Sequence, residues 1–407
     1  MNKTLWTKNF TLVTAASALG AAGGIAGGFA LSFLVFDETG STLASALILA
    51  IQLVPFFVLP LFLAPIMDRL PRKPFLVAGD VINGVLYALM GAYLLRFEFS
   101  YAAYLCYSLL LACLESFDEL AFQSIYPKLI PEGMEQQGYA VSTTLYPILR
   151  VIMLPLAGLL LDTVGTAWIL IGQGGLSLLA ALIESNIDIA EQRRGGEEKL
   201  FSFRRWRADI KEAAEYLKNE RGVTGIFSYM AVTNGVSNGY SSILIAFFRS
   251  FPGFTAAMYS LFSVFEFAGR TLGGAAQYKL KLAKEKKFGF TFLVYQIYEV
   301  MDMCLLWLPY PLMLANRAIV GFLGANSATM RQAAMQSYIP EELRARLNAF
   351  QNMLITAASG VLALLIGALG EMMDYRLCVT LCGATAFTAA WLLVWRRRRD
   401  VKKIFEK

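Results

Sequence analysis

Long apolar segments alternate with short polar ones along most of this sequence. About a dozen of them reach the roughly 20 residues that an apolar helix needs to cross a bilayer. The short, strictly alternating segments of a membrane β-barrel are absent. We therefore predict an all-α polytopic membrane protein with twelve transmembrane helices. The predicted spans are 9–36, 42–67, 75–95, 101–126, 138–161 and 166–187 in the first half, and 223–248, 255–277, 288–308, 311–338, 348–370 and 376–395 in the second.

The longest polar segment, residues 188–222, lies midway along the chain and is rich in Lys and Arg. Within it, Ile210, Ala213, Ala214 and Leu217 recur at helical spacing, which predicts an amphipathic helix on the cytoplasmic membrane surface. The predicted organisation follows from this break. It comprises a six-helix bundle (1–187), a basic cytoplasmic linker (188–222), a second six-helix bundle (223–395) and a basic cytoplasmic tail (396–407).

The second half of the chain repeats the first. One constant offset aligns the tripeptide Ile130-Pro131-Glu132 with Ile339-Pro340-Glu341, Gly158 with Gly367, and acidic Asp162 with acidic Glu371. The two six-helix pseudo-repeats therefore have the same orientation. Duplicated halves of this kind rock around a binding site at their interface in membrane transporters.

The first span contains glycines at helical spacing. Gly20, Gly24 and Gly28 recur every four residues, with Gly23 and Gly27 beside them. A row of small residues lets a neighbouring helix approach closely, so we expect tight packing along this row.

The composition excludes several function classes. The chain is 57% hydrophobic and only 16% charged, and it contains no histidine, so imidazole catalysis and imidazole proton relay are excluded. The five cysteines all lie in apolar segments without metal-ligand spacing. No phosphate-binding loop is present. We therefore expect no enzymatic activity, no cofactor and no metal. The first apolar run lacks a signal-peptidase site and is expected to stay in the membrane.

The basic residues indicate the orientation. When both termini are placed in the cytoplasm, 29 of the 36 Lys and Arg residues fall in cytoplasmic segments, as the positive-inside rule requires. Basic loops of this kind are ordinary in membrane proteins, so no nucleic-acid partner is expected. The predicted location is the cytoplasmic (inner) membrane of a prokaryote.

The predicted span 101–126 carries three acidic residues, Glu115, Asp118 and Glu119. Helical spacing predicts that they share one face with Phe122. Carboxylates are costly inside a membrane, so these side chains should face the protein interior or a water-filled cavity.

Two explanations of this acidic group stay open. In the first, Arg150 of the next span forms a structural ion pair with one of the acids. In the second, Asp118 or Glu115 binds a proton in competition with substrate. One arginine cannot neutralise three acids, and crowding of like charges favours proton binding by one of them. The sequence thus favours a group that couples transport to protons.

Other charged residues lie within predicted spans of the second half. Glu266 and Arg270 are four residues apart on one helix, a spacing that favours a structural ion pair. Glu299 and Asp302 lie deep in the span 288–308, and pairing with Arg317 is one explanation for them.

Polar residues of the second half are candidates for the substrate cavity. Asn234, Asn238 and Ser241 share one face of a span, and Arg317 and Asn326 lie in a second span. Polar side chains on central helices suit a substrate site. The same residues also serve as hydrogen-bond partners between helices, and both interpretations stay open.

A loop between the second and third spans carries a recognisable motif, Asp68-Arg69 followed by Arg72-Lys73. With this loop, the chain resembles the major facilitator superfamily over essentially its whole length. The family signature is G-x-x-x-D-R-x-G-R-K, from which this copy departs at Ala64 and Pro71. The segments YPKLIPEG and ILRVIMLPLAGLLLD, the second containing Arg150, resemble the macrolide-efflux and enterobactin-exporter branch.

The resemblance implies a gate at the cytoplasmic side. In the family, the acid equivalent to Asp68 faces the start of the eleventh span, here near Asn348. A carboxylate is stabilised at a helix N-terminus by partial positive charge and free N–H groups. Arg69, Arg72 and Lys73 are expected to join this gate. For Arg72 and Lys73, a role in topology alone is the alternative.

Together these observations predict a secondary transporter that works by alternating access. The expected activity is proton-coupled export of small amphiphilic compounds, such as drugs, macrolides or siderophore-like molecules. The alternatives are a lipid or lysolipid flippase, a solute uptake carrier of the same fold, and a non-transporting scaffold or sensor. The expected partners are a small-molecule substrate, protons and membrane lipids, and the expected state is a monomer.

Overall fold

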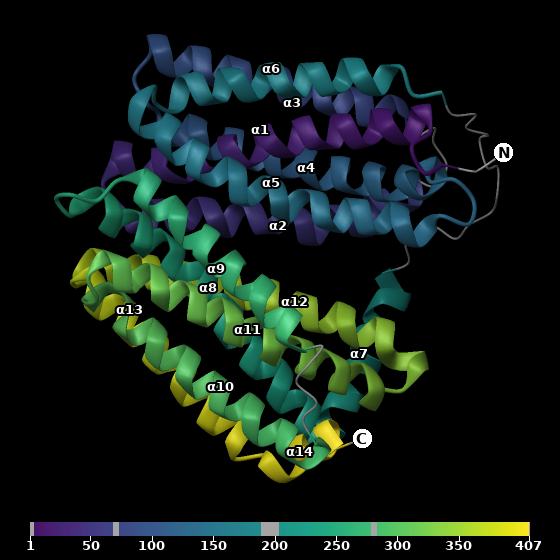
Figure 1. Cartoon of the computed structure of the whole chain (residues 1–407), viewed down its shortest axis with the longest axis vertical. Helices are drawn as coiled ribbons and strands as arrows, with labels where there is room; N and C mark the ends of the chain where they lie inside the picture. The colour runs from purple at the N-terminus through teal and green to yellow at the C-terminus, as the bar shows by residue number, and fades with distance from the viewer. Residues whose placement is uncertain (1–3, 68–72, 189–202, 278–282, 407) are drawn as a thin grey trace. The chain divides into compact units, whose positions relative to one another are not determined.

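The computed structural model describes residues 4–67, 73–188, 203–277 and 283–406. These residues are almost entirely helical and contain no β-strand (Figure 1). The first half contains α1 (Lys8–Thr39), α2 (Thr42–Met67), α3 (Lys73–Arg96), α4 (Tyr101–Leu129), α5 (Glu135–Thr163) and α6 (Thr166–Ser185). The second half contains α7 (Phe203–Asn219), α8 (Arg221–Ser250), α9 (Ala256–Gln277), α10 (Lys284–Cys304), η1 (Leu305–Trp307), α11 (Tyr310–Tyr338), α12 (Glu341–Met372), α13 (Tyr375–Ala389), η2 (Ala390–Trp395) and α14 (Arg398–Glu406).

The twelve predicted spans correspond to α1–α6 and α8–α13, so the predicted fold class is confirmed. Within the described ranges, seven helices are individually long and apolar enough to cross a membrane: α1, α3, α5, α6, α10 extended through η1, α12, and α13 extended through η2. The protein is a multi-pass membrane protein with a fully helical fold.

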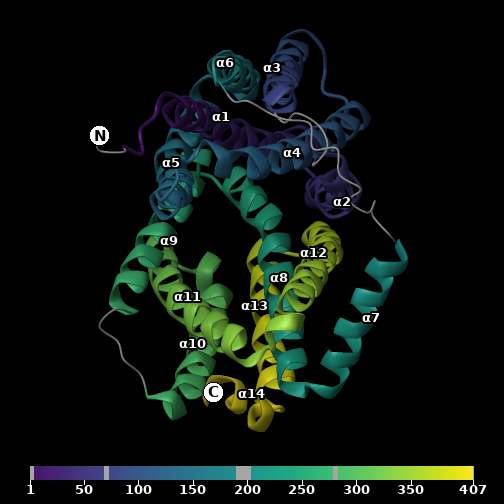
Figure 2. The same ribbon diagram turned by 90° about the vertical axis from the view of Figure 1, so that its right-hand side faces the viewer.

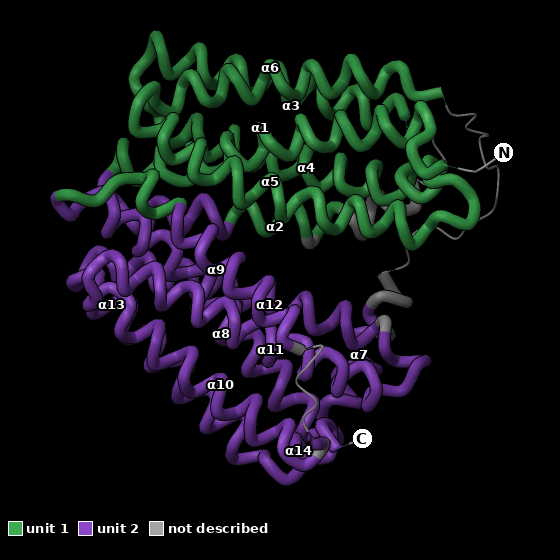
Figure 3. The backbone as a smooth tube through the Cα atoms, viewed as in Figure 1, with its two compact units in different colours: residues 1–39, 51–201, 253–260 green, residues 40–50, 202–252, 261–407 purple. Residues whose placement is uncertain are grey.

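The chain forms two compact units (Figure 3). Unit 1 comprises residues 1–39, 51–201 and 253–260, and unit 2 comprises residues 40–50, 202–252 and 261–407. The beginning of α2 therefore belongs to unit 2, and the beginning of α9 belongs to unit 1. The predicted bundles 1–187 and 223–395 do not include this exchange of helix ends.

Residues that the repeat equates make equivalent contacts. In unit 1, Asp162 at the end of α5 accepts hydrogen bonds from the backbone N–H groups of Ala256 and Ala257, at 3.3 and 3.0 Å. In unit 2, Glu371 at the end of α12 accepts one from the N–H of Leu43 at 3.0 Å and one from the Ser41 hydroxyl at 2.7 Å. Each carboxylate caps the beginning of a helix, where backbone N–H groups lack helical partners.

The two glycines that the repeat aligns, Gly158 and Gly367, also make equivalent contacts. A Cβ atom at Gly158 would lie 2.7 Å from the Cα of Ala257, and one at Gly367 would lie 2.6 Å from the Cβ of Ala46. Both glycines therefore permit close approach of the helix that the neighbouring carboxylate caps. The predicted repeat is thus visible in local contacts as well as in sequence.

The predicted glycine row of α1 is shifted by one position. A Cβ atom added at Gly20, Gly24 or Gly28 would meet no atom within 4 Å beyond the local backbone of α1. Gly23 and Gly27, in contrast, pack against Gln173 of α6. The two rows have the same four-residue spacing, so periodicity alone cannot choose between them. The neighbour α6 decides which row is buried.

The basic linker contains a helix, α7, whose apolar face packs against protein. Ala213 and Leu217 belong to a buried cluster of unit 2 that also contains Val223 and Leu347. Arg346 of α12 forms an ion pair with Glu212 of α7 at 2.7 Å. These contacts attach the helix to unit 2. The sequence had predicted that its apolar face would lie on the membrane surface.

The basic tail is also a docked helix. In α14, the apolar side chains of Val401, Ile404 and Phe405 join the same buried cluster. Their i, i+3, i+4 spacing is that of a single helix face. The prediction of a plain basic tail at 396–407 was incomplete. The many arginines and lysines around these three apolar residues hid the apolar pattern in the sequence.

Candidate functional site

Asp118 of α4 turns its carboxylate towards α3. Its Oδ2 atom accepts a hydrogen bond from Nδ2 of Asn83 at 2.6 Å. The neighbouring residue on α3, Gly79, provides the space for this carboxylate, because a Cβ atom there would lie 1.8 Å from Asp118 Oδ1. That Oδ1 atom is buried and accepts no hydrogen bond from a described residue.

Two more acids face Asp118. Asp80 of α3 and Glu184 of α6 are its electrostatic neighbours. Glu184 is only 3% exposed, and its Oε2 atom is buried without a hydrogen-bond partner in the described part of the chain. No described Lys or Arg forms an ion pair with any of these three acids. We call Asp80, Asp118 and Glu184, with Asn83, the carboxylate site.

Close packing of α3 on α6 assembles this site. The two helices lie side by side in both views (Figures 1 and 2). Added Cβ atoms at Gly84 and Gly174 would each lie within 3 Å of backbone on the partner helix. Small residues allow such backbone contact between membrane helices. This packing joins the two helices that carry Asp80 and Glu184, the electrostatic neighbours of Asp118.

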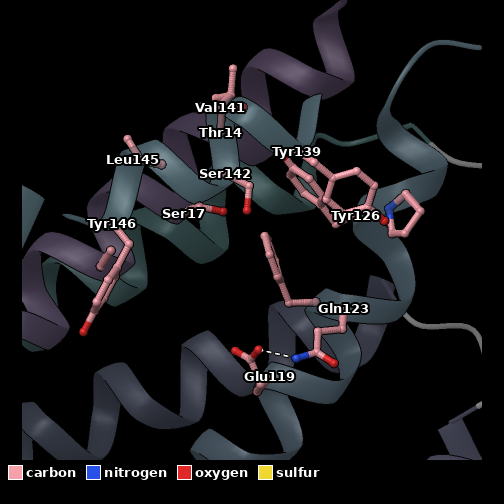
Figure 4. Close-up of a pocket in the computed structure, with 13 residues that line it drawn as sticks. Thr14, Ser17, Glu119, Gln123, Tyr126, Tyr139, Val141, Ser142, Leu145 and Tyr146 are labelled. Carbon is pink, nitrogen blue, oxygen red and sulfur yellow. Dashed lines mark hydrogen bonds between the residues drawn. The ribbon is translucent and has the colours of Figure 1, made fainter. Parts of the chain in front are cut away.

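Of the other two acids of α4, Glu115 is a further electrostatic neighbour of Asp118, whereas Glu119 is not. Glu119 accepts a hydrogen bond from Gln123 one turn along the helix and faces a separate cavity (Figure 4). Glu115 is exposed, with Tyr87 and Tyr107 as electrostatic neighbours. The predicted acidic face is therefore divided: Glu115 stays near Asp118, and Glu119 turns to a separate cavity. Successive residues such as Asp118 and Glu119 are about 100° apart around a helix and point in different directions.

The cavity beside Glu119 has a volume of about 660 Å³ and lies between α1, α4 and α5 of unit 1 (Figure 4). Its wall combines small hydroxyl groups with aromatic rings. The rings of Tyr126 and Tyr139 meet edge to face, with centroids 6.0 Å apart. The lining residues are Thr14, Ser17, Ala21, Glu119, Phe122, Gln123, Tyr126, Pro127, Tyr139, Val141, Ser142, Leu145 and Tyr146.

Arg150 does not pair with the acids of α4. Its side chain is exposed and makes no ion pair or hydrogen bond with a described residue. The structural ion pair considered as the alternative for Glu115, Asp118 and Glu119 is therefore not formed in this structure.

Unit 2 also contains buried acids, and one of them has a basic partner. Asp302 of α10 and Arg317 of α11 form a buried ion pair. Arg317 also donates hydrogen bonds to Asn316 Oδ1 at 2.9 Å and to the Tyr240 hydroxyl at 3.4 Å. The predicted contact between these charges is confirmed. Arg317, a predicted substrate residue, is thus engaged within the helix bundle.

Glu299, one turn before Asp302, is 3% exposed and accepts a hydrogen bond from the Tyr229 hydroxyl at 3.3 Å. It borders a second cavity, of about 210 Å³, between α8, α9, α10 and α11. The predicted ion pair of Arg270 with Glu266 is present at 2.7 Å, and Arg270 also borders this cavity.

The remaining predicted cavity residues divide into two groups. Asn238 donates to the Ser359 hydroxyl of α12 at 2.9 Å, and fully buried Asn326 donates to the Phe322 carbonyl at 2.8 Å. Ser241 donates to the Asn238 carbonyl at 2.6 Å. These three serve helix structure and packing. Asn234, which donates to the Met230 carbonyl at 2.8 Å, lines the second cavity.

A family model of the major facilitator superfamily matches residues 10–297 and 297–406. This chain belongs to that superfamily. Its fold is similar to that of a bacterial homologue of the human lysosomal transporter Spinster, solved inward-facing and unoccupied. That structure is 14% identical, with a TM-score of 0.66 over 97% of this chain and 93% of the other.

Two further superfamily structures have a similar fold. The nucleoside transporter NupG is 11% identical, with a TM-score of 0.70 over 95% of this chain and 98% of the other. A POT family transporter in complex with 5-aminolevulinic acid is 11% identical, with a TM-score of 0.70 over 96% of each chain. A comparison with curated proteins found no match. The macrolide-efflux and enterobactin-exporter branch stays a prediction.

Most of the superfamily loop motif lies outside the described residues. This applies to Asp68, Arg69 and Arg72. Lys73 begins α3 and donates a hydrogen bond to the Ser185 carbonyl at the end of α6, at 2.8 Å. It therefore links the two helices that carry Asp80 and Glu184. The proposed contact of Asp68 with Asn348 stays a prediction.

Sequence reasoning missed three residues that this superfamily member brings into its polar sites: Asp80, Glu184 and Arg331. Each is a charged side chain within or near the end of an apolar span, which is the same signal that identified Asp118. A lone charge near the end of a span is ordinary, and only helix packing shows that Asp80 and Glu184 meet Asp118.

Proposed function

We propose that this chain is a secondary transporter that couples proton movement to the export of small amphiphilic compounds by alternating access. The observation that carries the proposal is the carboxylate site. Three acids meet there without a described basic partner, and two of their oxygen atoms are buried and unpartnered.

A buried ionised carboxylate without a partner loses hydration worth several kcal/mol. Neutralising it therefore requires a proton or a cation. Acids held in this way inside membrane helices form the proton pathways of pumps and transporters. Because the chain has no histidine, carboxyl groups are the suitable titratable groups for such a role. Asp118 is the proposed proton carrier, with Asp80 and Glu184 as partners in the same site.

The cavity beside Glu119 supports a substrate of mixed polarity. Its volume of about 660 Å³ falls within the roughly 300–1,000 Å³ typical of small-molecule sites. Its tyrosine rings offer apolar surface together with hydroxyl groups. Glu119 and Gln123 supply polar contacts at one end (Figure 4). A compound with an aromatic or aliphatic body and a polar end fits this wall.

The proposed location is the cytoplasmic membrane of a prokaryote, with both termini inside. The basic linker and tail support this orientation, because positive residues accumulate on the cytoplasmic side. Asp68, Arg69, Arg72 and Lys73 are proposed to close the cytoplasmic gate, with Asp68 at the N-terminal end of α12. Substitution Asp68→Asn is expected to leave this gate open more often, and cysteine labelling from the cytoplasmic side would then increase.

The central experiment measures transport in proteoliposomes with and without an imposed pH gradient. A panel of labelled amphiphilic compounds is screened first with the unmodified protein. The variant Asp118→Asn keeps the size of the side chain and one oxygen that can accept from Asn83, but it cannot carry a proton. We expect at least a tenfold loss of gradient-driven transport, whereas exchange of substrate across vesicles without a gradient persists.

The control is Glu132→Gln, which removes an exposed carboxyl group in the loop before α5. Undiminished gradient-driven transport by Asp118→Asn would refute the proton-coupling role. Transport driven by a Na⁺ gradient would identify Na⁺, in place of the proton, as the coupling ion. Substrate movement in the same direction as the protons would identify an uptake carrier. Movement of labelled lysolipid between the leaflets would identify a flippase.

A further inference from the structure

The second cavity lies wholly within unit 2 and is more strongly charged than the first. Four helices contribute to its wall: Asn234 from α8, Arg270 from α9, Tyr298 and Glu299 from α10, and Arg331 from α11. Its volume of about 210 Å³ is below the usual range for a whole drug-sized compound. It is large enough for the polar end of one.

Arg331 is the distinctive side chain of this cavity. It donates one hydrogen bond, from Nη1 to the Tyr295 hydroxyl at 3.1 Å, and no described carboxylate lies within ion-pair distance of it. A guanidinium group has five N–H donors in a planar fork. Most of these donors remain for a ligand, and their geometry matches a carboxylate or phosphate.

The acids nearby are each engaged elsewhere. Asp302 pairs with Arg317, and Glu266 pairs with Arg270. Glu299 is held by the Tyr229 hydroxyl, whose ring packs against that of Tyr295 with centroids 4.6 Å apart. Arg331 is therefore set beside a rigid pair of tyrosines with no acidic partner of its own among the described residues.

Arg317, on the same helix, provides an internal contrast. It is 3% exposed and engages an acid, an amide oxygen and a tyrosine hydroxyl. A paired acid is what a structural arginine requires, because a buried charge is stable only when paired. Arg331 faces a cavity and lacks a described acidic partner, which is typical of a binding residue.

We propose that this cavity binds a carboxylate group of the transported compound through Arg331, with Tyr295 fixing the orientation of the guanidinium group. Of the arginines that line this cavity, Arg270 is paired with Glu266, so Arg331 alone is left to balance a single negative charge of a ligand. This inference rests on the proposed transport function and narrows its substrate class to amphiphilic monocarboxylates.

The test uses binding, which does not require coupled transport. The purified protein in lipid nanodiscs is titrated with 1-naphthylacetate and with its neutral amide, and thermal stability is recorded. The amide keeps the shape and apolar body but lacks the charge. The unmodified protein is expected to be stabilised by the acid at concentrations at least tenfold below those needed with the amide.

Two variants assign this preference to one side chain. Arg331→Gln removes the charge and should weaken binding of the acid about 10–100-fold, as expected for loss of a charge-assisted bidentate contact. Arg331→Lys keeps the charge without the planar fork and should retain part of the affinity. Arg399→Gln, which removes an exposed arginine of α14 outside this cavity, is the matched control and should keep the acid preference.

Equal binding of acid and amide by the unmodified protein would overturn the inference, and so would unchanged acid binding by Arg331→Gln. If Arg331→Gln does not yield a monodisperse protein, the comparison of Arg331→Lys with the unmodified protein decides the matter. The variant Asp118→Asn separates the two proposals. It should lose gradient-driven transport and still prefer the acid, so failure of proton coupling and failure of carboxylate recognition give different results.

Discussion

Unit 1 and unit 2 each place acidic side chains among apolar helices, but among the described residues only Asp302 of unit 2 has a buried arginine partner; Glu299 of unit 2 has a tyrosine hydroxyl instead. In unit 1, Asp80, Asp118 and Glu184 meet without a described basic partner. In unit 2, Asp302 is paired with Arg317, and both side chains are almost fully buried. The same residue type in the same kind of helix can therefore be paired with a base or lack a described basic partner.

The comparison teaches how to distinguish the two cases. A buried ion pair with additional hydrogen bonds is complete without any ligand, and removing one partner leaves an uncompensated charge. An acid whose oxygen atoms are buried without donors is incomplete, and a bound proton completes it. Pairing state, more than depth in the helix, separates structural acids from candidate coupling acids in this transporter.

The largest expected effect is on Arg317. The variant Arg317→Gln leaves Asp302 buried without its partner, which costs about 3–5 kcal/mol in comparable cases. We expect a loss of monodisperse protein on size-exclusion chromatography. The double variant Asp302→Asn with Arg317→Gln removes both charges and should recover most of the yield. Equal yields for Arg317→Gln and the unmodified protein would show that buried Asp302 does not need its arginine partner, which contradicts the proposed difference between the units.

The next effect concerns Asp118. The change Asp118→Asn in unit 1 removes a charge that has no described basic partner, so we expect the melting temperature to stay within a few degrees or to rise. Gradient-driven transport should fall at least tenfold in the same preparation. A strong destabilisation, like that expected for Arg317→Gln, would instead identify Asp118 as a structural acid.

A smaller effect is expected at Gly79, whose missing side chain makes room for Asp118. The substitution Gly79→Ala places a Cβ atom 1.8 Å from Asp118 Oδ1, so the carboxylate or α3 must shift. Overpacking of this kind costs about 1–3 kcal/mol. We expect a lower melting temperature and reduced gradient-driven transport.

The matched control for Gly79→Ala is Gly20→Ala in α1, where the added group would meet no atom within 4 Å beyond the local helix backbone. There the better helix propensity of alanine should raise stability by up to about 1 kcal/mol. Equal melting temperatures for the two variants would show that Gly79 does not hold Asp118 in place.

Much of the fold follows from the sequence because the bilayer constrains it. The lengths of the apolar segments predicted α1–α6 and α8–α13, since only helices of this length satisfy their backbone in lipid. The constant offset between Asp162 and Glu371 predicted the repeat, and both residues cap helix beginnings in the structure. These features depend on local pattern and length alone.

The candidate site could be predicted only in part. The acids of α4 were found because charges in an apolar run are costly. The sequence could not predict which of these acids turns towards α3, because the orientation of the Asp118 carboxylate depends on Gly79 and Asn83 of that helix. In the same way, Gly23 was indistinguishable from Gly24 until α6 was placed. The spacing of residues along one helix does not show which distant helix packs against it.

The smallest expected effect concerns the repeated caps. Asp162→Asn and Glu371→Gln weaken charge-assisted hydrogen bonds to backbone N–H groups at the beginnings of α9 and α2. Loss of a helix cap costs about 1 kcal/mol, and the amide variants keep an oxygen acceptor, so each should cost less than that. Melting temperatures in nanodiscs should fall slightly and by similar amounts. A large fall for one variant and none for the other would show that the two repeats have diverged in function, and the difference between unit 1 and unit 2 would then extend beyond their buried acids to the helix ends.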